Sequence, residues 1–155
     1  MGGNVPTNAD IVACAREYIN TPFAAKGRVK GHKSDCVGLV LMVAGELGLK
    51  DVHGVSLDGN LYSDYADQPV GNYVHEMCVK HLVYVPVRLV KPGNVVTIAA
   101  GSAPCHVGFI ASNAAGGLTL IHAYNGGKLK VVEQPLDVRW LRRLRGGFTF
   151  PEVKE

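Results

Sequence analysis

The sequence predicts an α+β fold, with helices in its first half and an antiparallel sheet in its second half. Before about residue 85, apolar residues recur at the spacing of amphipathic or buried helices. After Pro86, short β-branched or alternating runs are separated by Gly, Ser, Asn and Pro, as in strands joined by turns. Helices followed by antiparallel strands are the pattern of an α+β domain.

Length and composition exclude several classes of protein. The 155 residues are enough for a single domain with one sizeable core, and we expect residues 1–155 to form one domain. Hydrophobic residues make up 47% of the chain, which is typical of a globular protein. The net charge of +3 is too small to indicate nucleic-acid binding. No apolar run approaches the roughly 18 residues of a membrane span.

The first helix is expected over about residues 8–19, with Thr7 as its N-cap. It ends before Pro22, because the residue preceding a proline avoids helical angles. Residues 22–34 combine two glycines with several basic side chains, so we expect an exposed and mobile loop. This composition is compatible with a lid that closes over the site, and that alternative stays open.

The second helix is expected from about Asp35 to Leu47 and is apolar nearly all round, which indicates a central, buried helix. Gly48 is suited to end it. Residues 49–72 are rich in turn formers, with short helical turns expected near 61–66, and a third helix is expected over 74–82.

The second half of the chain contains the expected strands. Hairpin turns are indicated by Ala115-Gly116-Gly117 and by Asn125-Gly126-Gly127. The expected strands cover residues 95–99, 106–111, 118–123, 129–133 and 147–150.

Cys36 is the candidate nucleophile, because it lies where a polar loop turns into the second helix. The helix dipole and unpaired backbone N–H groups favour a thiolate there, although the charge of Asp35 opposes it slightly. Cys105 is a weaker candidate, since its expected loop position lacks a helix dipole. Cys14 and Cys78 are interpreted as small core residues. The cysteines form no C-x-x-C pair, so we expect no zinc site.

Two histidines complete a candidate catalytic site. His106 begins one expected strand and His122 lies near the end of the next, so a hairpin would bring both rings to one edge of the sheet. In this hypothesis Cys36 attacks a carbonyl carbon, His106 exchanges the proton, and His122 orients the first imidazole. The Cys36 backbone N–H would help to hold the oxyanion. Each residue taken alone has a structural alternative as a packing side chain.

Several segments together resemble the NlpC family of cell-wall cysteine peptidases, which have a papain-like α+β fold. The resemblance maps the family's nucleophile to Cys36, its base to His106 and its third polar residue to His122. It covers about residues 8–151 and implies hydrolysis of peptidoglycan stem peptides between γ-D-glutamyl and a diamino acid, without a cofactor. The matching segments are Thr21-Pro22-Phe23, Asp35–Val40, Lys91–Val95, His106–Ile110 and Ile121–Ala123.

The resemblance is closer to the phage-encoded branch of the family, the tail-associated cell-wall peptidases. The segments that carry it are 28–31, 127–137, Arg139-Trp140 and Gly147-Phe148. It implies stem peptides as substrate and phage tail proteins as partners. Residues 1–10 show no signal peptide. We therefore expect synthesis in the cytoplasm and action at the cell wall, within a phage-like particle or after export by another route.

Two positions depart from the family pattern. Phe23 replaces a tyrosine whose hydroxyl lies near the nucleophile in many members, and Asn94 replaces an aspartate. Two alternatives to the peptidase stay open. The same site could perform other acyl chemistry, as an amidase or acyltransferase, and the loss of the tyrosine hydroxyl is compatible with a catalytically weak structural component of a tail tip.

Overall fold

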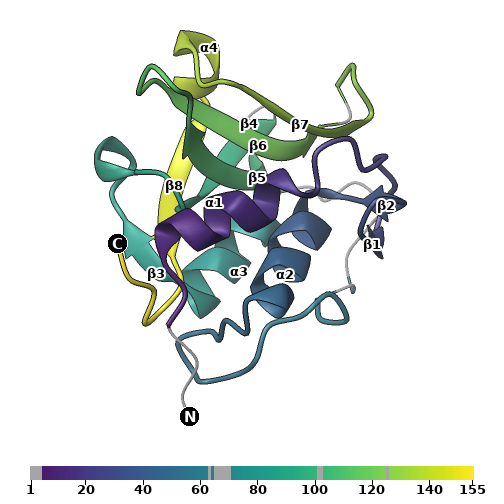
Figure 1. Cartoon of the computed structure of the whole chain (residues 1–155), viewed down its shortest axis with the longest axis vertical. Helices are drawn as coiled ribbons and strands as arrows, with labels where there is room; N and C mark the ends of the chain where they lie inside the picture. The colour runs from purple at the N-terminus through teal and green to yellow at the C-terminus, as the bar shows by residue number, and fades with distance from the viewer. Residues whose placement is uncertain (1–4, 63, 65–70, 101–102, 125) are drawn as a thin grey trace.

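The chain was analysed as a computed structural model, which describes residues 5–62, 64, 71–100, 103–124 and 126–155. Helices α1, α2 and α3 gather on one side of an antiparallel sheet, and all three contact its strand β5 (Figure 1). The short helix α4 lies at the far end of the sheet from α3. The helices are α1 (Asn8–Arg16), α2 (Cys36–Glu46), α3 (Tyr73–His81), α4 (Val138–Leu141) and the 3-10 turn η1 (Val87–Leu89).

The main sheet has six strands in the order β3-β8-β4-β5-β6-β7, and its neighbouring strands are antiparallel. This arrangement confirms the predicted α+β fold. Its strands are β3 (Val83–Val85), β4 (Val95–Ala100), β5 (Ala103–Ser112), β6 (Leu118–Tyr124), β7 (Lys130–Pro135) and β8 (Leu144–Thr149).

Apolar side chains cover both faces of the sheet. The larger core lies between the helices and one face, and it contains Leu39 of α2 together with Phe109 and Phe148. The smaller core lies on the other face, where Trp140 of α4 packs on Leu120. The sheet is therefore the central layer of the domain, with β5 buried at its middle. In the described parts of the chain, no helix is long and apolar enough to cross a membrane.

Helix α1 begins as predicted but ends earlier. Thr7 and Asp10 form a reciprocal capping box, in which each side chain accepts a hydrogen bond from the other residue's backbone N–H. The helix ends at Arg16 rather than at residue 19, because Asn20 adopts a positive φ of 77° and donates its N–H to Val131 O of β7. The apolar pattern continues through the turns after Arg16, which explains why the sequence predicted a helix three residues too long.

Helix α2 matches its expected boundaries closely. Asp35 is the N-cap and accepts the N–H of Gly38 at 2.7 Å, so Cys36 is the first helical residue. Gly48 follows the helix with a φ of 66°, as a C-terminal glycine does. Both ends are thus set by local sequence, and this fixes where the Cys36 side chain emerges.

The expected open loop at residues 22–34 instead contains a short hairpin, β1 (Arg28–Val29) and β2 (Lys33–Ser34). The Arg28 guanidinium forms an ion pair with Asp35 at 2.9 Å, and both side chains are largely buried. Lys30 Nζ lies 2.6 Å from Glu17 and 3.0 Å from Glu46. These contacts attach the hairpin to α1 and α2, and the sequence pattern did not indicate them.

The remaining differences concern short elements. The third helix lies one residue earlier than expected at each end. β8 begins at Leu144, three residues before the expected strand, and the three-residue strand β3 and the single-turn helix α4 were not predicted. Of the turns expected at 61–66, residues 61 and 62 are not helical, and residues 63, 65 and 66 lie outside the described residues.

The packing of the hairpin on α2 requires glycine at position 38. A Cβ at this position would lie 2.2 Å from the carbonyl oxygen of Gly27. We predict that Gly38→Ala lowers the free energy of unfolding by about 1–3 kcal/mol in urea titrations, because backbone must move to relieve the overlap. Gly127→Ala is the control, since its Cβ would meet nothing within 4 Å. Equal stability of the two variants would contradict this account of the contact.

Candidate active site

The structure places Cys36 at the start of α2, packed against strand β5. The residue is only 7% exposed. The backbone N–H groups of Val37 and Val107 act on its sulfur as hydrogen-bond donors. Val107 directly follows His106 in β5, so the candidate nucleophile lies against the strand that carries the candidate base.

The two predicted histidines are brought together by the sheet. His106 Nε2 lies 2.7 Å from His122 Nδ1, and His122 Nε2 lies 3.0 Å from Gln134 Oε1. His122 is fully buried, whereas His106 is partly exposed. The three side chains come from β5, β6 and β7, and they form a continuous hydrogen-bonded chain across three neighbouring strands.

Glycine at position 108 makes room for this chain. A Cβ there would lie 2.9 Å from His122 Cβ and 2.8 Å from the carbonyl oxygen of Ile121. Any larger residue would displace His122 from its place beside His106. The His-Val-Gly sequence therefore has a physical role. His106 supplies the imidazole, and Gly108, two residues later, leaves the space that His122 occupies.

Gln134 decides which nitrogen of His106 carries a proton. Its Oε1 is an acceptor, so His122 Nε2 must donate and His122 Nδ1 must accept. His106 Nε2 therefore donates to His122, and a neutral His106 keeps an unprotonated Nδ1. An imidazole with a free lone pair at Nδ1 is in the form that a general base requires.

Desolvation disfavours the charged forms of both Cys36 and His106. Desolvation first, and then the negative charge of Asp35, raises the pKa of the Cys36 thiol to about 12. Desolvation, with smaller effects of His122 and Arg143, lowers the pKa of His106 to about 3. Desolvation likewise lowers the pKa of His122 to about 4. The thiolate expected at a helix start is thus not favoured, because burial outweighs the two backbone N–H groups.

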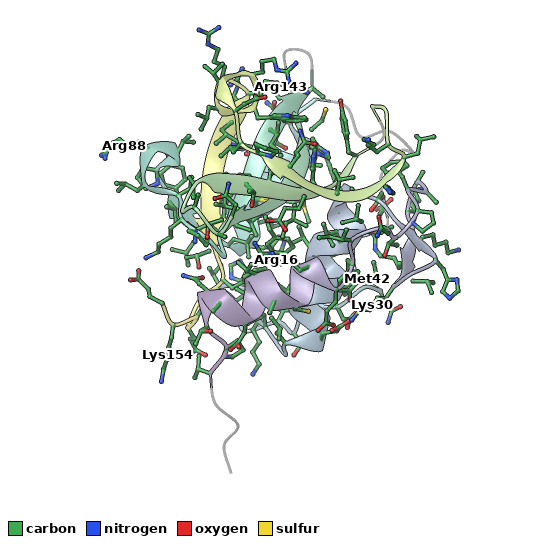
Figure 2. The ribbon with its side chains drawn as sticks, turned by 45° about the horizontal axis from the view of Figure 1, so that its top comes forward. Arg16, Lys30, Met42, Arg88, Arg143 and Lys154 are labelled. Carbon is green, nitrogen blue, oxygen red and sulfur yellow. The ribbon has the colours of Figure 1, made fainter. Side chains whose placement is uncertain are left out.

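Aromatic rings fix His122 from two sides. Tyr124 stacks on its ring with centroids 5.1 Å apart, and Trp140 contacts it edge-on at 5.0 Å. The Arg143 guanidinium lies over the Trp140 ring at 4.5 Å. Arg143 is labelled near the top of Figure 2. These contacts restrict the ring orientation of His122, which in turn holds His106.

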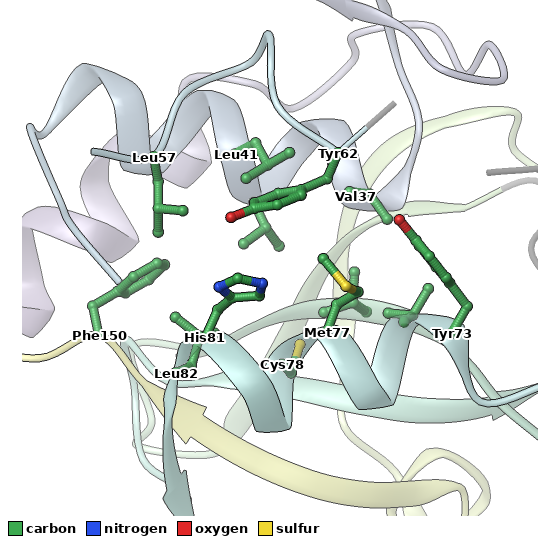
Figure 3. Close-up of a pocket in the computed structure, with 13 residues that line it drawn as sticks. Val37, Leu41, Leu57, Tyr62, Tyr73, Met77, Cys78, His81, Leu82 and Phe150 are labelled. Carbon is green, nitrogen blue, oxygen red and sulfur yellow. The ribbon is translucent and has the colours of Figure 1, made fainter. Parts of the chain in front are cut away.

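A separate apolar pocket lies between α2 and α3, with a cavity volume of about 70 Å³ (Figure 3). Val37 and Val107 line it, and their backbone N–H groups also reach the Cys36 sulfur, so the pocket lies behind the candidate nucleophile. His81 also lines it and is held by Asp51 at 2.8 Å. The pocket lacks the polar groups of the chain formed by His106, His122 and Gln134.

The other cysteines have no comparable surroundings, and all four are free thiols. Cys14 donates to Glu46 at 3.3 Å, and burial together with this carboxylate raises its pKa to about 12. Burial also raises the pKa of Cys78 to about 12. Cys105 lies on β5, where it has no helix N-terminus, and its Sγ is 3.9 Å from the Ala100 carbonyl oxygen.

The two departures from the family pattern have different structural outcomes. Asn94 Oδ1 accepts the N–H of Lys91 at 3.0 Å. The asparagine therefore makes the turn hydrogen bond that an aspartate at this position would make. Phe23 packs against the main core and contributes no hydroxyl. No group of three or more His, Cys, Asp or Glu side chains within the described residues is arranged to hold a metal ion.

Sequence reasoning missed the outer part of the site. Gln134 lies one residue beyond the expected end of its strand and within segment 127–137 of the resemblance, but nothing in the sequence indicated its hydrogen bond to His122. Trp140 and Arg143 belong to α4 and the turn after it, neither of which was predicted. The Arg139-Trp140 dipeptide was noted in the resemblance, but only the fold shows that the tryptophan contacts His122.

Comparison with known proteins defines the class of fold. No family model matches the sequence, and a search of curated proteins finds no relative. The fold is similar to that of the NlpC/p60 domain of the peptidoglycan hydrolase SagA, with a TM-score of 0.57 and 21% identity over 92% of this chain and 98% of that one. The chain thus has the predicted NlpC/p60 fold.

Two further solved structures share it. NlpC2 from Trichomonas vaginalis matches with a TM-score of 0.61 and 15% identity over 97% of this chain, which spans 48% of that protein. An N-acetylmuramoyl-L-alanine amidase from Bacteroides uniformis matches with a TM-score of 0.56 and 14% identity, over 96% of this chain and 99% of that one. At these identities the likeness establishes the fold.

The lowered pKa of His122 predicts a pH-dependent stability. Unfolded histidines bind protons below about pH 6.5, whereas folded His122 does so only near its lowered pKa of about 4. The unfolded state therefore binds more protons, and the free energy of unfolding falls as the pH decreases from about 6.5 toward 4. We predict that His122→Asn reduces the fall between pH 7 and pH 5 by about 1–2 kcal/mol.

Urea titrations at pH 7, 6 and 5 measure this slope. His32→Asn is the matched control, because His32 is exposed in the β1–β2 hairpin. An unchanged slope in His122→Asn would show that His122 is not kept neutral by burial.

Proposed function

We propose that the chain is a cysteine peptidase that hydrolyses amide bonds in peptidoglycan stem peptides. The observation that carries this proposal is the hydrogen-bonded chain from Gln134 through His122 to His106, together with the backbone N–H of Val107, the next residue after His106, which reaches the buried Cys36 sulfur. Support also comes from the fold, which is similar to domains described as a peptidoglycan hydrolase and an N-acetylmuramoyl-L-alanine amidase. Cys36, His106 and His122 are the proposed catalytic residues.

In the acylation step, the Cys36 sulfur attacks the carbonyl carbon of the scissile bond. Because both groups rest uncharged, the thiol proton moves to His106 Nδ1 as the carbon–sulfur bond forms. The imidazolium is held by His122 through Nε2. It then gives its proton to the leaving amine nitrogen, and the carbon–nitrogen bond breaks.

In the deacylation step, water attacks the thioester carbonyl while His106 Nδ1 takes one of its protons. The carbon–sulfur bond breaks, and the proton returns to the Cys36 sulfur. In both steps the Cys36 backbone N–H, as the first of α2, is the proposed donor to the oxyanion. The thiol supplies the nucleophile, so this reaction requires no cofactor.

The finer assignment is a bond between γ-D-glutamyl and a diamino acid, in an enzyme of the phage tail type. This assignment rests on the sequence resemblance. The same assignment implies phage tail proteins as partners. It also implies action at the cell wall, in a phage-like particle or after export by another route. The Bacteroides amidase favours one alternative, in which the same residues cleave the muramoyl–L-alanine bond.

We predict that Cys36→Ala lowers hydrolysis of a stem peptide by about 10³-fold or more, because no other thiol can replace it. The substrates are an L-alanyl-γ-D-glutamyl-diamino acid tripeptide and a muramoyl dipeptide, and mass spectrometry of the products identifies the bond that is cut. Circular dichroism checks that the variant is folded.

Cys105→Ala is the matched control, because Cys105 adjoins His106 in β5 but has no helix N-terminus. The peptidase proposal fails if Cys36→Ala keeps its turnover, or if Cys105→Ala loses it. A folded wild-type protein that cleaves neither substrate would favour the structural tail-tip alternative instead.

A further inference from the structure

Arg143 lies in the turn between α4 and β8, and two contacts hold its side chain in place. Its Nε donates to the Ala99 carbonyl oxygen at 2.9 Å, and its guanidinium lies over the Trp140 ring at 4.5 Å. Its own carbonyl oxygen accepts the Ala99 N–H at 2.7 Å. A guanidinium fixed in this way loses little further freedom when it binds a ligand.

This guanidinium lies on the side of the candidate histidines. Trp140, on which it rests, also contacts His122 edge-on. Ala99 follows Ile98, whose Cα pairs with that of His106 across β4 and β5. In agreement with this placement, the positive charge of Arg143 contributes to lowering the pKa of His106 and His122.

No acidic side chain in the described part of the molecule neutralises Arg143. The arginines that do form ion pairs there are Arg16, Arg28 and Arg139. Arg143 is partly exposed, and within the same residues its two terminal nitrogens have no hydrogen-bond partner. The fork that pairs with a carboxylate is therefore open to a ligand.

An uncompensated cation here opposes the proposed mechanism. Catalysis requires His106 to become an imidazolium, and the charge of Arg143 disfavours that state. An anionic group bound to Arg143 would cancel this effect at the moment when the substrate arrives. Acidic substrates would then be cleaved faster than neutral ones, because only an acidic substrate brings the anion that offsets the charge of Arg143.

We propose that Arg143 binds a carboxylate of the substrate on the side of His106 and His122 and so determines specificity for acidic peptides. This inference rests on the proposed function, because stem peptides carry free carboxylates near the bond that is cut. It adds a specificity-determining residue that no sequence motif in the chain indicated.

The first experiment does not depend on peptide hydrolysis. Cys36 is alkylated with iodoacetate, which carries a carboxylate, and with iodoacetamide, which is its neutral counterpart. Cys36→Ala provides the background from the other three thiols. We expect Arg143→Gln to lower the ratio of the two Cys36 rates, iodoacetate over iodoacetamide, by about tenfold. Arg142→Gln is the control, because Arg142 is an exposed neighbour with the same charge.

The second experiment compares two stem peptides that differ only in a carboxylate or a carboxamide on the glutamyl residue. We expect Arg143→Gln to lower kcat/KM about 10–100-fold for the acidic peptide and much less for the amidated one. Arg143→Lys, which keeps the charge but loses the planar fork, should fall between wild type and Arg143→Gln.

The two experiments separate the two proposals. An unchanged alkylation ratio in Arg143→Gln overturns the carboxylate site, whether or not the peptides are cleaved. A lowered ratio in a protein that cleaves neither peptide supports the carboxylate site and contradicts the peptidase function.

Discussion

The hydrogen-bonded chain from Gln134 through His122 to His106 is the interaction on which the rest of the site depends. It exists because β5, β6 and β7 are neighbours in one sheet and because Gly108 leaves space for His122. The acceptor oxygen of Gln134 sets the tautomer of His122, and His122 sets that of His106. The free lone pair of His106, the proposed base, is therefore determined by Gln134, which lies two strands away in the sheet.

Burial gives this site its electrostatic character. Cys36 and His106 lie in surroundings that disfavour charge on either of them, so the resting protein holds a thiol and a neutral imidazole. Asp35 and Arg143 strengthen this preference, since each places a like charge near the group that must ionise. Charge develops on these two groups only when compensating interactions are supplied, as a bound substrate can do. Among the described residues, the fixed guanidinium of Arg143 is the group best suited to receive a compensating anion.

The sequence predicted those features that local chemistry determines. Thr7 and Asp35 are capping residues next to apolar runs, and the glycine pairs after β5 and β6 indicate hairpins, so the helix starts and the meeting of His106 with His122 could be derived. Other features depend on contacts between distant segments. The pairing of Arg28 with Asp35, the role of Gln134 and the position of Arg143 over Trp140 have no local pattern. The pKa of Cys36 was misjudged for the same reason, because the helix start is visible in the sequence and its burial is not.

The protonation states of His106 and His122 test the central claim most directly. Nitrogen-15 NMR of the histidine side chains at pH 7, assigned with His106→Asn and His122→Asn, measures the tautomer of each ring. The account predicts that both rings are neutral and protonated at Nε2, with an unprotonated Nδ1. A proton at His106 Nδ1 in the free protein, either in the other neutral tautomer or in a resting imidazolium, would contradict it.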